Sequence, residues 1–399
     1  MVATMRILFT VVELHTAFTL AHQLQCPENI RGLASQMLNS NIARGQGIGQ
    51  SGASTSYIEL GIFYNATEQA EWSTYLQKSL SGAVPLLPNA TANAGLPLDR
   101  FSIGTALAIA GNDSYAPTIK SLQDSVALQP RNADNSLWYY NNRANLSAYH
   151  NLSYADGMYS YPSFAIVSSF ENSTDCEDDS KVGAAAALEQ VKLIYDVCKR
   201  SDGLVVHGYD ASKAHSWADP ESGASPLVWG RALGWFTIGV LRSLSLLSQE
   251  SRAFGGLKEI FNEVVRAQID ASERSVNVTG SYGVWQVVDQ PGEKGNFIEA
   301  SASAMTVYAL LKGARTDLIE DQAFREKAVN TGLGIYQTLI SDFFIENGNG
   351  TLSYNGTSSV ASLSGDVNFE YYTTRPTVLN SLIGTSAFTL AALEVEKVC

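Results

Sequence analysis

Apolar side chains recur at intervals of three and four residues along most of the chain, and rarely at intervals of two. This spacing is typical of amphipathic or buried α-helices and predicts an all-α protein. The dipeptide Ser225-Pro226 has the form of a helix start, with an N-cap followed by proline at the first helical position. We expect helices over residues 57–64, 68–80, 103–109, 115–126, 158–170, 182–199, 226–247, 256–271, 300–314, 321–340 and 377–397.

The expected helices are of two kinds. Segments 103–109 and 300–311 are small and apolar, whereas segments 68–80 and 321–340 carry more charge. A closed ring of helix hairpins requires this alternation, because its inner helices are buried on both faces and its outer helices on one. We therefore predict an α/α toroid that forms a single domain over residues 22–399. A helical solenoid is the alternative, but no fixed sequence period supports it.

Long loops rich in Trp, Tyr, Asn and Gly separate the helices, at residues 129–154, 201–225, 277–298 and 348–375. Long ordered loops in a compact domain usually carry function. Indole rings that stack on sugar faces would use such an arrangement, and the alternative is that they only plug the ring of helices. The tryptophans in or beside these loops are Trp138, Trp217, Trp229, Trp235 and Trp285.

The net charge is negative: the chain has 26 Lys and Arg against 39 Asp and Glu, which gives a formal charge of -13. A phosphate-binding surface normally has the opposite balance, so nucleic acid is not expected as a partner. No apolar run near 20 residues lies in the body of the chain, so no membrane-spanning helix is expected either. We expect a monomer.

Residues 1–21 have the features of a secretory signal peptide: Arg6, an apolar stretch, and small residues at Thr19-Leu20-Ala21 for cleavage. Glu13 and His15 interrupt the apolar stretch, and the alternative is an amphipathic first helix. Nine sequons with the pattern Asn-x-Ser/Thr favour a secreted, extracellular glycoprotein. They are at Asn65, Asn89, Asn112, Asn145, Asn151, Asn172, Asn277, Asn349 and Asn355.

The cysteines are Cys26, Cys176, Cys198 and Cys399, and no pair has CxxC spacing. This argues against zinc and thioredoxin-type chemistry. In an oxidising compartment they could form two disulfides, for example Cys26–Cys399 across the termini and Cys176–Cys198 beside one helix. Three connectivities are open at this point, and four buried free thiols are a further alternative.

Carboxylates are the remaining candidates for acid–base chemistry. The histidines lack the helical spacing of metal ligands, and neither a GxSxG elbow nor a glycine-rich phosphate loop is present, so we predict neither a metal nor a cofactor. Asp99 and Asp156 each directly precede an apolar helix. Each carboxylate could cap its helix, or line the mouth of the toroid.

Arg231 and Trp235 are four residues apart on one expected helix and share a face. A guanidinium beside an indole suits a carboxylated sugar, because the fork can bind the carboxylate and the ring can stack on the pyranose. The alternative is an arginine packed on a tryptophan for structural reasons.

These segments resemble glycoside hydrolase family 105, the unsaturated rhamnogalacturonyl hydrolases, which are related to the unsaturated glucuronyl hydrolases of family 88. LDRFSIG at 98–104 resembles the family's first aspartate motif, and YADGMYSYPSF at 154–164 resembles its second. The long central signature is similar to DGLVVHGYD at 202–210 and WADPESGASPLVWGRALGW at 217–235. Two C-terminal signatures resemble GSYGVWQVVDQP with GNFIEASASAMTVYALLKG, and NFEYYTTRPTVLNSLIGTSAF.

The resemblance covers about residues 57–394 and implies an (α/α)6 barrel. It implies removal of a terminal Δ4,5-unsaturated uronic acid from the products of pectin lyases, by protonation of C4 and addition of water at C5. By motif position, Asp156 matches the general acid/base and Asp99 the second active-site aspartate. The positions that match substrate contacts are His207, Trp229, Arg231 and Trp235.

The chain departs from the family where a Trp-His pair usually precedes the second aspartate. Here Trp138 is followed by Tyr139, and the loop to Asp156 is longer. Tyr139 or His150 would then supply the polar contact to substrate. The alternatives to the rhamnogalacturonan substrate are glycosaminoglycan- or ulvan-derived uronides, an ordinary inverting glycosidase that uses Asp99 and Asp156, and a lectin without activity.

Overall fold

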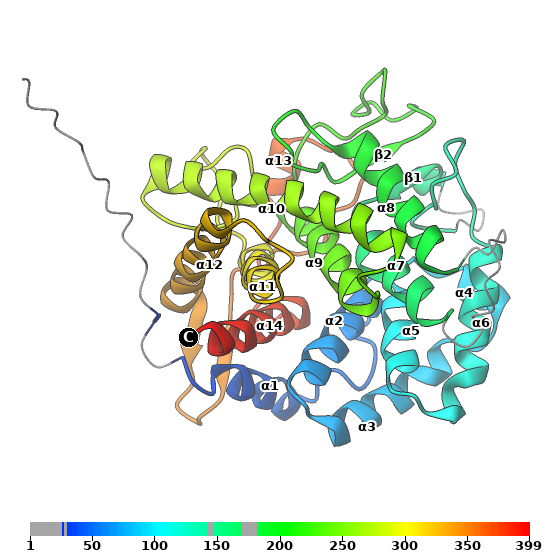
Figure 1. Cartoon of the computed structure of the whole chain (residues 1–399), viewed down its shortest axis with the longest axis horizontal. Helices are drawn as coiled ribbons and strands as arrows, with labels where there is room; N and C mark the ends of the chain where they lie inside the picture. The colour runs from blue at the N-terminus through cyan, green and yellow to red at the C-terminus, as the bar shows by residue number, and fades with distance from the viewer. Residues whose placement is uncertain (1–25, 28–29, 142–146, 170–181) are drawn as a thin grey trace, which may run out of the picture.

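A computed structural model describes residues 26–27, 30–141, 147–169 and 182–399. The predicted signal peptide lies outside the described residues. Six helices form an inner ring, in which each helix packs against the next and the last packs against the first (Figure 1). They are α2 (Ser56–Gln69), α5 (Arg100–Ile109), α7 (Gly157–Val167), α9 (Gly230–Leu246), α11 (Ala300–Arg315) and α14 (Leu382–Val398).

A second layer of helices surrounds this ring, and each of them packs on an inner helix. The first outer helix packs on the last inner helix, so the first and last helices of the described residues meet. The (α/α)6 barrel predicted from the sequence is therefore confirmed. The outer helices are α1 (Leu33–Ala43), α3 (Ser73–Ala83), α6 (Ala116–Ala127), α8 (Ala184–Cys198), α10 (Arg252–Thr279) and α12 (Gln322–Phe343).

Burial follows the two kinds of helix expected from the sequence. Every residue of α11 from Ala300 to Ala314 is buried, because this helix is covered by neighbours on all sides. The outer helix α10 alternates buried apolar and exposed polar residues. Close packing in the inner ring depends on small residues: a Cβ atom added at Gly239 of α9 would lie 2.1 Å from the Met158 carbonyl oxygen of α7.

The loops at one end of the barrel contain short elements that position side chains over the ring. Strands β1 (Leu152–Tyr154) and β2 (Gly208–Asp210) pair antiparallel, as do β3 (Phe344–Glu346) and β4 (Leu352–Tyr354). The other short elements are η1 (Val84–Leu86), α4 (Ala90–Ala94), η2 (Asp113–Tyr115), η3 (Ser147–Tyr149) and α13 (Phe369–Thr373). Within the described ranges, no helix combines the length and apolar character that crossing a membrane requires.

Several helix boundaries differ from the sequence-based expectation. Helix α2 ends at Gln69 and not at 64, α3 begins at Ser73 and not at 68, and α14 begins at Leu382 and not at 377. Helix α9 begins at Gly230 and not at Ser225-Pro226, because Trp229 forms a β-bridge with Val287 and holds the preceding segment extended. Helix α10 extends well beyond 256–271 at both ends and stops at Gly280, whose left-handed backbone (φ 79°) ends the helix. Helix α1 was not expected.

One of the disulfides considered from the sequence is present. Cys26 and Cys399 are bonded across a sequence separation of 373 residues. Cys198 is a buried free thiol, which excludes its pairing with Cys176 in this structure, and Cys176 lies outside the described residues.

Candidate active site

A narrow cavity opens where the N-terminal ends of the inner helices converge. Asp99 and Asp156 line it together with Arg231, so the two predicted acid–base residues and the predicted carboxylate-binding residue share one space. The remaining lining residues are Thr55, Ile58, Tyr139, Tyr140, Tyr154, Trp229, Trp235, Val360, Ala361, Ser362 and Ile383.

Neither aspartate caps its helix. Asp99 directly precedes α5 and Asp156 directly precedes α7, but both have helical backbone angles and neither side chain accepts a capping hydrogen bond. Since capping is the ordinary reason for an aspartate at this position, the two carboxyl groups are available for other chemistry.

Asp156 is held in a setting that favours its neutral, protonated form. Its carboxyl group is buried, and one oxygen, Oδ2, has no hydrogen-bond partner among the described residues. Burial raises the pKa of Asp156 to about 7, although a backbone hydrogen bond and the positive charge of Arg231 act in the opposite direction. A carboxylic acid with such a pKa can donate a proton near neutral pH.

Asp99 is also buried, and its Oδ1 accepts a hydrogen bond of 2.5 Å from the Tyr139 hydroxyl. Burial raises the pKa of Asp99 to about 8, the Tyr139 hydrogen bond lowers it, and the charge of Asp156 raises it. The hydroxyl of Tyr139, predicted as a substrate contact, is therefore committed to Asp99, although its side chain lines the cavity.

Arg231 is anchored by the protein on two of its three nitrogens. NH1 pairs with Glu299 at 3.3 Å and donates to the Ser358 carbonyl at 2.5 Å, and NH2 donates to the Ser359 carbonyl at 2.7 Å. None of these bonds uses Nε–H, and the guanidinium lies 4.6 Å from the centre of the Trp229 ring. Arg231 thus has both a structural role and an edge, Nε–H with the second NH2 hydrogen, that can face a carboxylate.

Comparisons with known proteins identify the family of this chain. The family model for glycosyl hydrolase family 88 matches residues 60–399. The chain belongs to glycosyl hydrolase family 88. Protein Atu3128 of Agrobacterium fabrum (strain C58 / ATCC 33970) is 33% identical over 215 residues, which are 52% of this chain and 88% of that protein. Because the members of this family are glycoside hydrolases, the protein is a glycoside hydrolase.

Solved structures agree with the assignment of this protein to family 88. A family 105 glycoside hydrolase from C. acetobutylicum ATCC 824 matches with a TM-score of 0.74 and 26% identity, covering 92% of this chain and all of that one. An unsaturated glucuronyl hydrolase from Bacillus sp. GL1 matches with a TM-score of 0.64 and 13% identity, covering 92% of this chain and 96% of that one. The second likeness concerns the fold alone.

The two predicted histidine contacts are not on the cavity wall of this family 88 protein. His207 is completely buried, and its Nε2 lies 3.5 Å from Asp156 Oδ2. The imidazole therefore contacts Asp156 from inside the protein and not from the cavity. His150 is half-buried and its ring lies 5.1 Å from that of Trp138.

The tryptophans divide into two groups. Trp229 and Trp235 line the cavity, and Trp235 also packs on Tyr159, with ring centres 4.7 Å apart. The others are held elsewhere by structural contacts: Trp217 Nε1 donates to the Leu363 carbonyl, Trp285 Nε1 donates to Ser275 Oγ, and the Trp138 ring packs on His150. Of the five indole rings considered from the sequence, Trp229 and Trp235 are therefore the two that line the cavity.

Sequence reasoning alone missed two residues that support the site. Glu299 precedes α11, accepts from the backbone N–H of Ala302 and Ser358, and pairs with Arg231. Tyr372 of α13 contacts His207. Glu299 carries the one detectable signal, since it is a lone carboxylate before a long apolar helix. In the part of the chain that the structure describes, no group of three or more His, Cys, Asp or Glu side chains could hold a metal ion.

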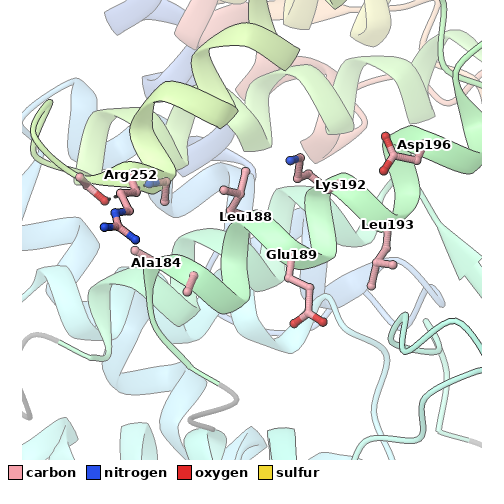
Figure 2. A pocket seen from close by; sticks show the side chains of 10 residues that line it. Ala184, Leu188, Glu189, Lys192, Leu193, Asp196 and Arg252 are labelled. Carbon is pink, nitrogen blue, oxygen red and sulfur yellow. Dashed lines mark hydrogen bonds between the residues drawn. The ribbon is translucent and has the colours of Figure 1, made fainter. Parts of the chain in front are cut away.

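A more open hollow lies on the outside of the family 88 barrel, between α8 and the start of α10 (Figure 2). Its charged side chains, which include Glu189, Lys192, Asp196 and Arg252, are exposed to solvent, and its floor is apolar. No buried carboxyl group comparable to Asp99 or Asp156 is among the described residues that line this hollow. The narrow cavity at the helix N-termini is therefore the candidate active site, and the outer hollow is not.

Proposed function

We propose that the protein removes a terminal Δ4,5-unsaturated uronic acid from oligosaccharides by hydrating its C4=C5 double bond. The observation that carries this proposal is the buried carboxyl group of Asp156, whose Oδ2 has no hydrogen-bond partner among the described residues and whose pKa of about 7 keeps it protonated in mildly acidic solution. Hydration of an enol ether needs one positioned acid that is protonated at the working pH and then a base, and one carboxyl group can serve as both.

The geometry supports a mechanism in which Asp156 protonates C4. Positive charge then develops at C5 and the ring oxygen, and water adds at C5 while the Asp156 carboxylate takes a proton from it. The resulting hemiketal opens and releases the neighbouring sugar. The anomeric carbon is not attacked, so the spacing rule for two-carboxylate glycosidases does not apply. Asp99 lines the same cavity, and a charge on Asp156 raises the pKa of Asp99, so Asp99 keeps its proton when Asp156 has given up its own.

Recognition of the uronic acid falls to Arg231 and the indole rings. The free Nε–H edge of Arg231 can pair with the C6 carboxylate, and Trp229 and Trp235 offer aromatic faces to the ring. The overall charge of -13 repels the substrate only weakly at cellular ionic strength, because surface charges are screened within about 10 Å.

We infer that the substrate is a rhamnogalacturonan fragment. Formation of the double bond removes the stereocentre at C4, so galacturonate and glucuronate yield the same unsaturated ring and only the adjacent sugar distinguishes the substrates. The resemblance of the motifs to family 105, the unsaturated rhamnogalacturonyl hydrolases, favours rhamnose as that sugar, and the matched solved structure at 26% identity is a family 105 glycoside hydrolase. Glycosaminoglycan fragments are the second candidate, because the matched Bacillus enzyme is an unsaturated glucuronyl hydrolase responsible for glycosaminoglycan degradation.

The test is to incubate the protein with lyase-generated oligosaccharides and to follow the ultraviolet absorbance of the double bond. A hydratase removes the absorbance, whereas an inverting glycosidase leaves it intact and a lectin releases no sugar. Asp156→Asn should reduce turnover at least about 1000-fold while substrate binding persists. Asp196→Asn, in the exposed outer hollow, is the matched control and should keep full activity. Retained activity in Asp156→Asn would overturn the assignment.

We further propose that the protein is secreted and glycosylated. The Cys26–Cys399 disulfide is typical of an oxidising compartment. Asn65 is buried in α2, so it is not an acceptor in the folded protein, and Asn151 is half-buried. Asn145 and Asn172 lie outside the described residues. The exposed sequons are at Asn89, Asn112, Asn277, Asn349 and Asn355.

Secretion is tested by expressing the full chain in a eukaryotic secreting host. We expect protein in the medium with His22 as its first residue and a loss of mass after treatment with an N-glycosidase. Protein retained in the cells with residues 1–21 intact would contradict the proposal.

A further inference from the structure

The imidazole of His207 is placed between two groups deep in the barrel. Its Nδ1 lies 2.8 Å from the Tyr372 hydroxyl, and its Nε2 faces Asp156 Oδ2 at 3.5 Å. Neither Nε2 nor Oδ2 has a hydrogen-bond partner among the described residues, so neither atom of this pair is engaged by another group there. A contact of 3.5 Å is long for a hydrogen bond, and such contacts often shorten when substrate binds.

The protonation states of Tyr372 and His207 determine which ring nitrogen of His207 carries the proton. Burial raises the pKa of Tyr372 well above its usual value, so its hydroxyl keeps its proton. Burial and the nearby Arg231 lower the pKa of His207 to about 3, so the imidazole is neutral and carries one N–H. The Tyr372 hydroxyl has no acceptor other than Nδ1 among the described residues. Tyr372 therefore donates to Nδ1, and the single imidazole proton is on Nε2.

The side chains of Tyr372 and His207 are held in place by a set of ring and hydrogen-bond contacts. Tyr372 stacks on Trp229, with ring centres 6.0 Å apart and an interplanar angle of 24°. Gln286 donates to the Tyr372 carbonyl and accepts from Trp229 Nε1. The His207 ring also packs on Trp229, at 4.6 Å. These contacts leave the tyrosine and the imidazole little freedom to turn.

We propose that Tyr372 and His207 form a hydrogen-bonded relay behind Asp156, in which Tyr372 fixes the Nε2–H tautomer of His207 and this N–H faces Asp156 Oδ2. The relay rests on the proposed function and deepens it. Because a donor faces Oδ2, the acidic proton of Asp156 is directed to the other carboxyl oxygen. After proton transfer the same donor stabilises the Asp156 carboxylate, which then acts on water. Tyr372 and His207 are thus positioning residues that act through Asp156.

The first test is Tyr372→Phe. Without the hydroxyl, His207 can place its proton on Nδ1, and the bare Nε2 would then bind and retain the acidic proton of Asp156. We expect kcat to fall about tenfold, the equivalent of one ordinary hydrogen bond. KM should change little, and the alkaline limb of the kcat profile should move to higher pH by up to about one pH unit. The other groups that face Asp156 are unchanged: Asp99, Arg231, Tyr139, Tyr140 and Tyr154.

The matched control is Tyr336→Phe. Tyr336 is also fully buried, and its hydroxyl has no partner among the described residues. This variant removes the same atom from the outer helix α12 and should leave kcat and its pH profile as in the wild type. A fall in kcat for Tyr372→Phe without movement of the alkaline limb would indicate a packing role alone and would overturn the relay.

The second test uses substitutions of His207. Gln carries an acceptor and a donor like the neutral imidazole, whereas Leu carries neither. We expect His207→Gln to retain at least about a tenth of the wild-type kcat and His207→Leu to lose substantially more. Equal losses in the two variants would contradict a role as a neutral bridge between Tyr372 and Asp156.

A third measurement separates failure of the relay from failure of the proposed function. The 15N chemical shifts of histidine report which ring nitrogen carries the proton. His207 should be neutral with its proton on Nε2 between pH 5 and 8, and Tyr372→Phe should change this tautomer. The spectrum does not depend on activity, so it tests the relay even if the wild type leaves the double bond intact. An Nδ1–H tautomer in the wild type would exclude the relay.

Discussion

The residues around the acid combine two buried carboxyl groups with one arginine that is already engaged. Arg231 pairs with Glu299, and it therefore offsets only part of the burial that raises the pKa of Asp156. If Arg231 faced the acid without Glu299, its charge would favour the Asp156 carboxylate and reduce the fraction of Asp156 that carries a proton. The ion pair with Glu299 thus lets one cation bind an anionic sugar beside a group that must stay neutral.

Arg231→Lys should affect both recognition and stability. Lysine cannot present the planar edge to a carboxylate or hold both the Ser358 and Ser359 carbonyls, so KM for the unsaturated uronide should rise roughly 10- to 100-fold. The free energy of unfolding should fall by about 2–4 kcal/mol, because buried partners lose their donor. Steady-state kinetics and urea unfolding measure the two effects. An unchanged unfolding midpoint would contradict the anchoring role.

Asp99→Asn should change how stability depends on pH. The pKa of Asp99 is raised from 3.8 to about 8 in the folded state, so its contribution to stability is complete below about pH 4 and is lost as the pH rises to 8. The wild type should lose on the order of a few kcal/mol between pH 5 and 8, and the asparagine variant should lose less. Urea unfolding at the two pH values tests this. Parallel losses in both proteins would show that Asp99 is ionised throughout.

At the scale of the helix, the acid depends on how α7 packs. Asp156 is at the first end of α7, and Gly239 of α9 allows the backbone of α7 to approach at Met158, two residues further on. The position of the acid is therefore set by contact between two helices as much as by its own surroundings.

Gly239→Ala should push these two helices apart. The added Cβ atom would lie 2.1 Å from the Met158 carbonyl oxygen, and overpacking of this kind costs about 1–3 kcal/mol. We expect a lower melting temperature and a fall in kcat through displacement of Asp156. Gly255→Ala is the control, since Gly255 is an exposed residue of α10 with no atom near the added Cβ, and it should be neutral or slightly stabilising.

Sequence patterns predict elements better than they predict contacts. The spacing of apolar residues separates inner helices such as α11 from outer ones such as α12, because that spacing directly reflects how many faces are buried. The predicted start of α9 is wrong, because Ser225-Pro226 is a local signal, whereas the pairing of Trp229 with Val287 is a contact between distant residues that overrides it. The surroundings of His207 show a similar limit: motif position brings this residue to the site, but only the fold shows that it is buried with Nε2 3.5 Å from Asp156 Oδ2.

At the scale of the whole molecule, the ring is closed by the two ends of the chain. Helix α1 precedes the residues matched by the family model, which start at 60, yet it packs on α14. The disulfide between Cys26 and Cys399 joins the same two regions covalently. The last helix pair of the barrel is therefore assembled from opposite ends of the sequence.

Replacing Cys26 and Cys399 by serine should destabilise the protein by roughly 2–5 kcal/mol, because the unfolded chain regains the freedom that the link removes. The melting temperature should fall, and that of the wild type should fall to the same level in reductant. The double variant should not respond to reductant. A reductant response that persists in the double variant would point to another disulfide.

Because the disulfide between Cys26 and Cys399 joins the segment before the outer helix α1 to the end of the inner helix α14, the ring of helices is closed irrespective of where the chain starts. A short peptide joining these ends would make the backbone circular, and the chain could then be reopened at the exposed turn of residues 347–350 between β3 and β4. Such a circular permutant keeps every helix–helix contact while moving the termini to a different sector of the ring. The order in which the helices are synthesised is therefore separable from the architecture that they build.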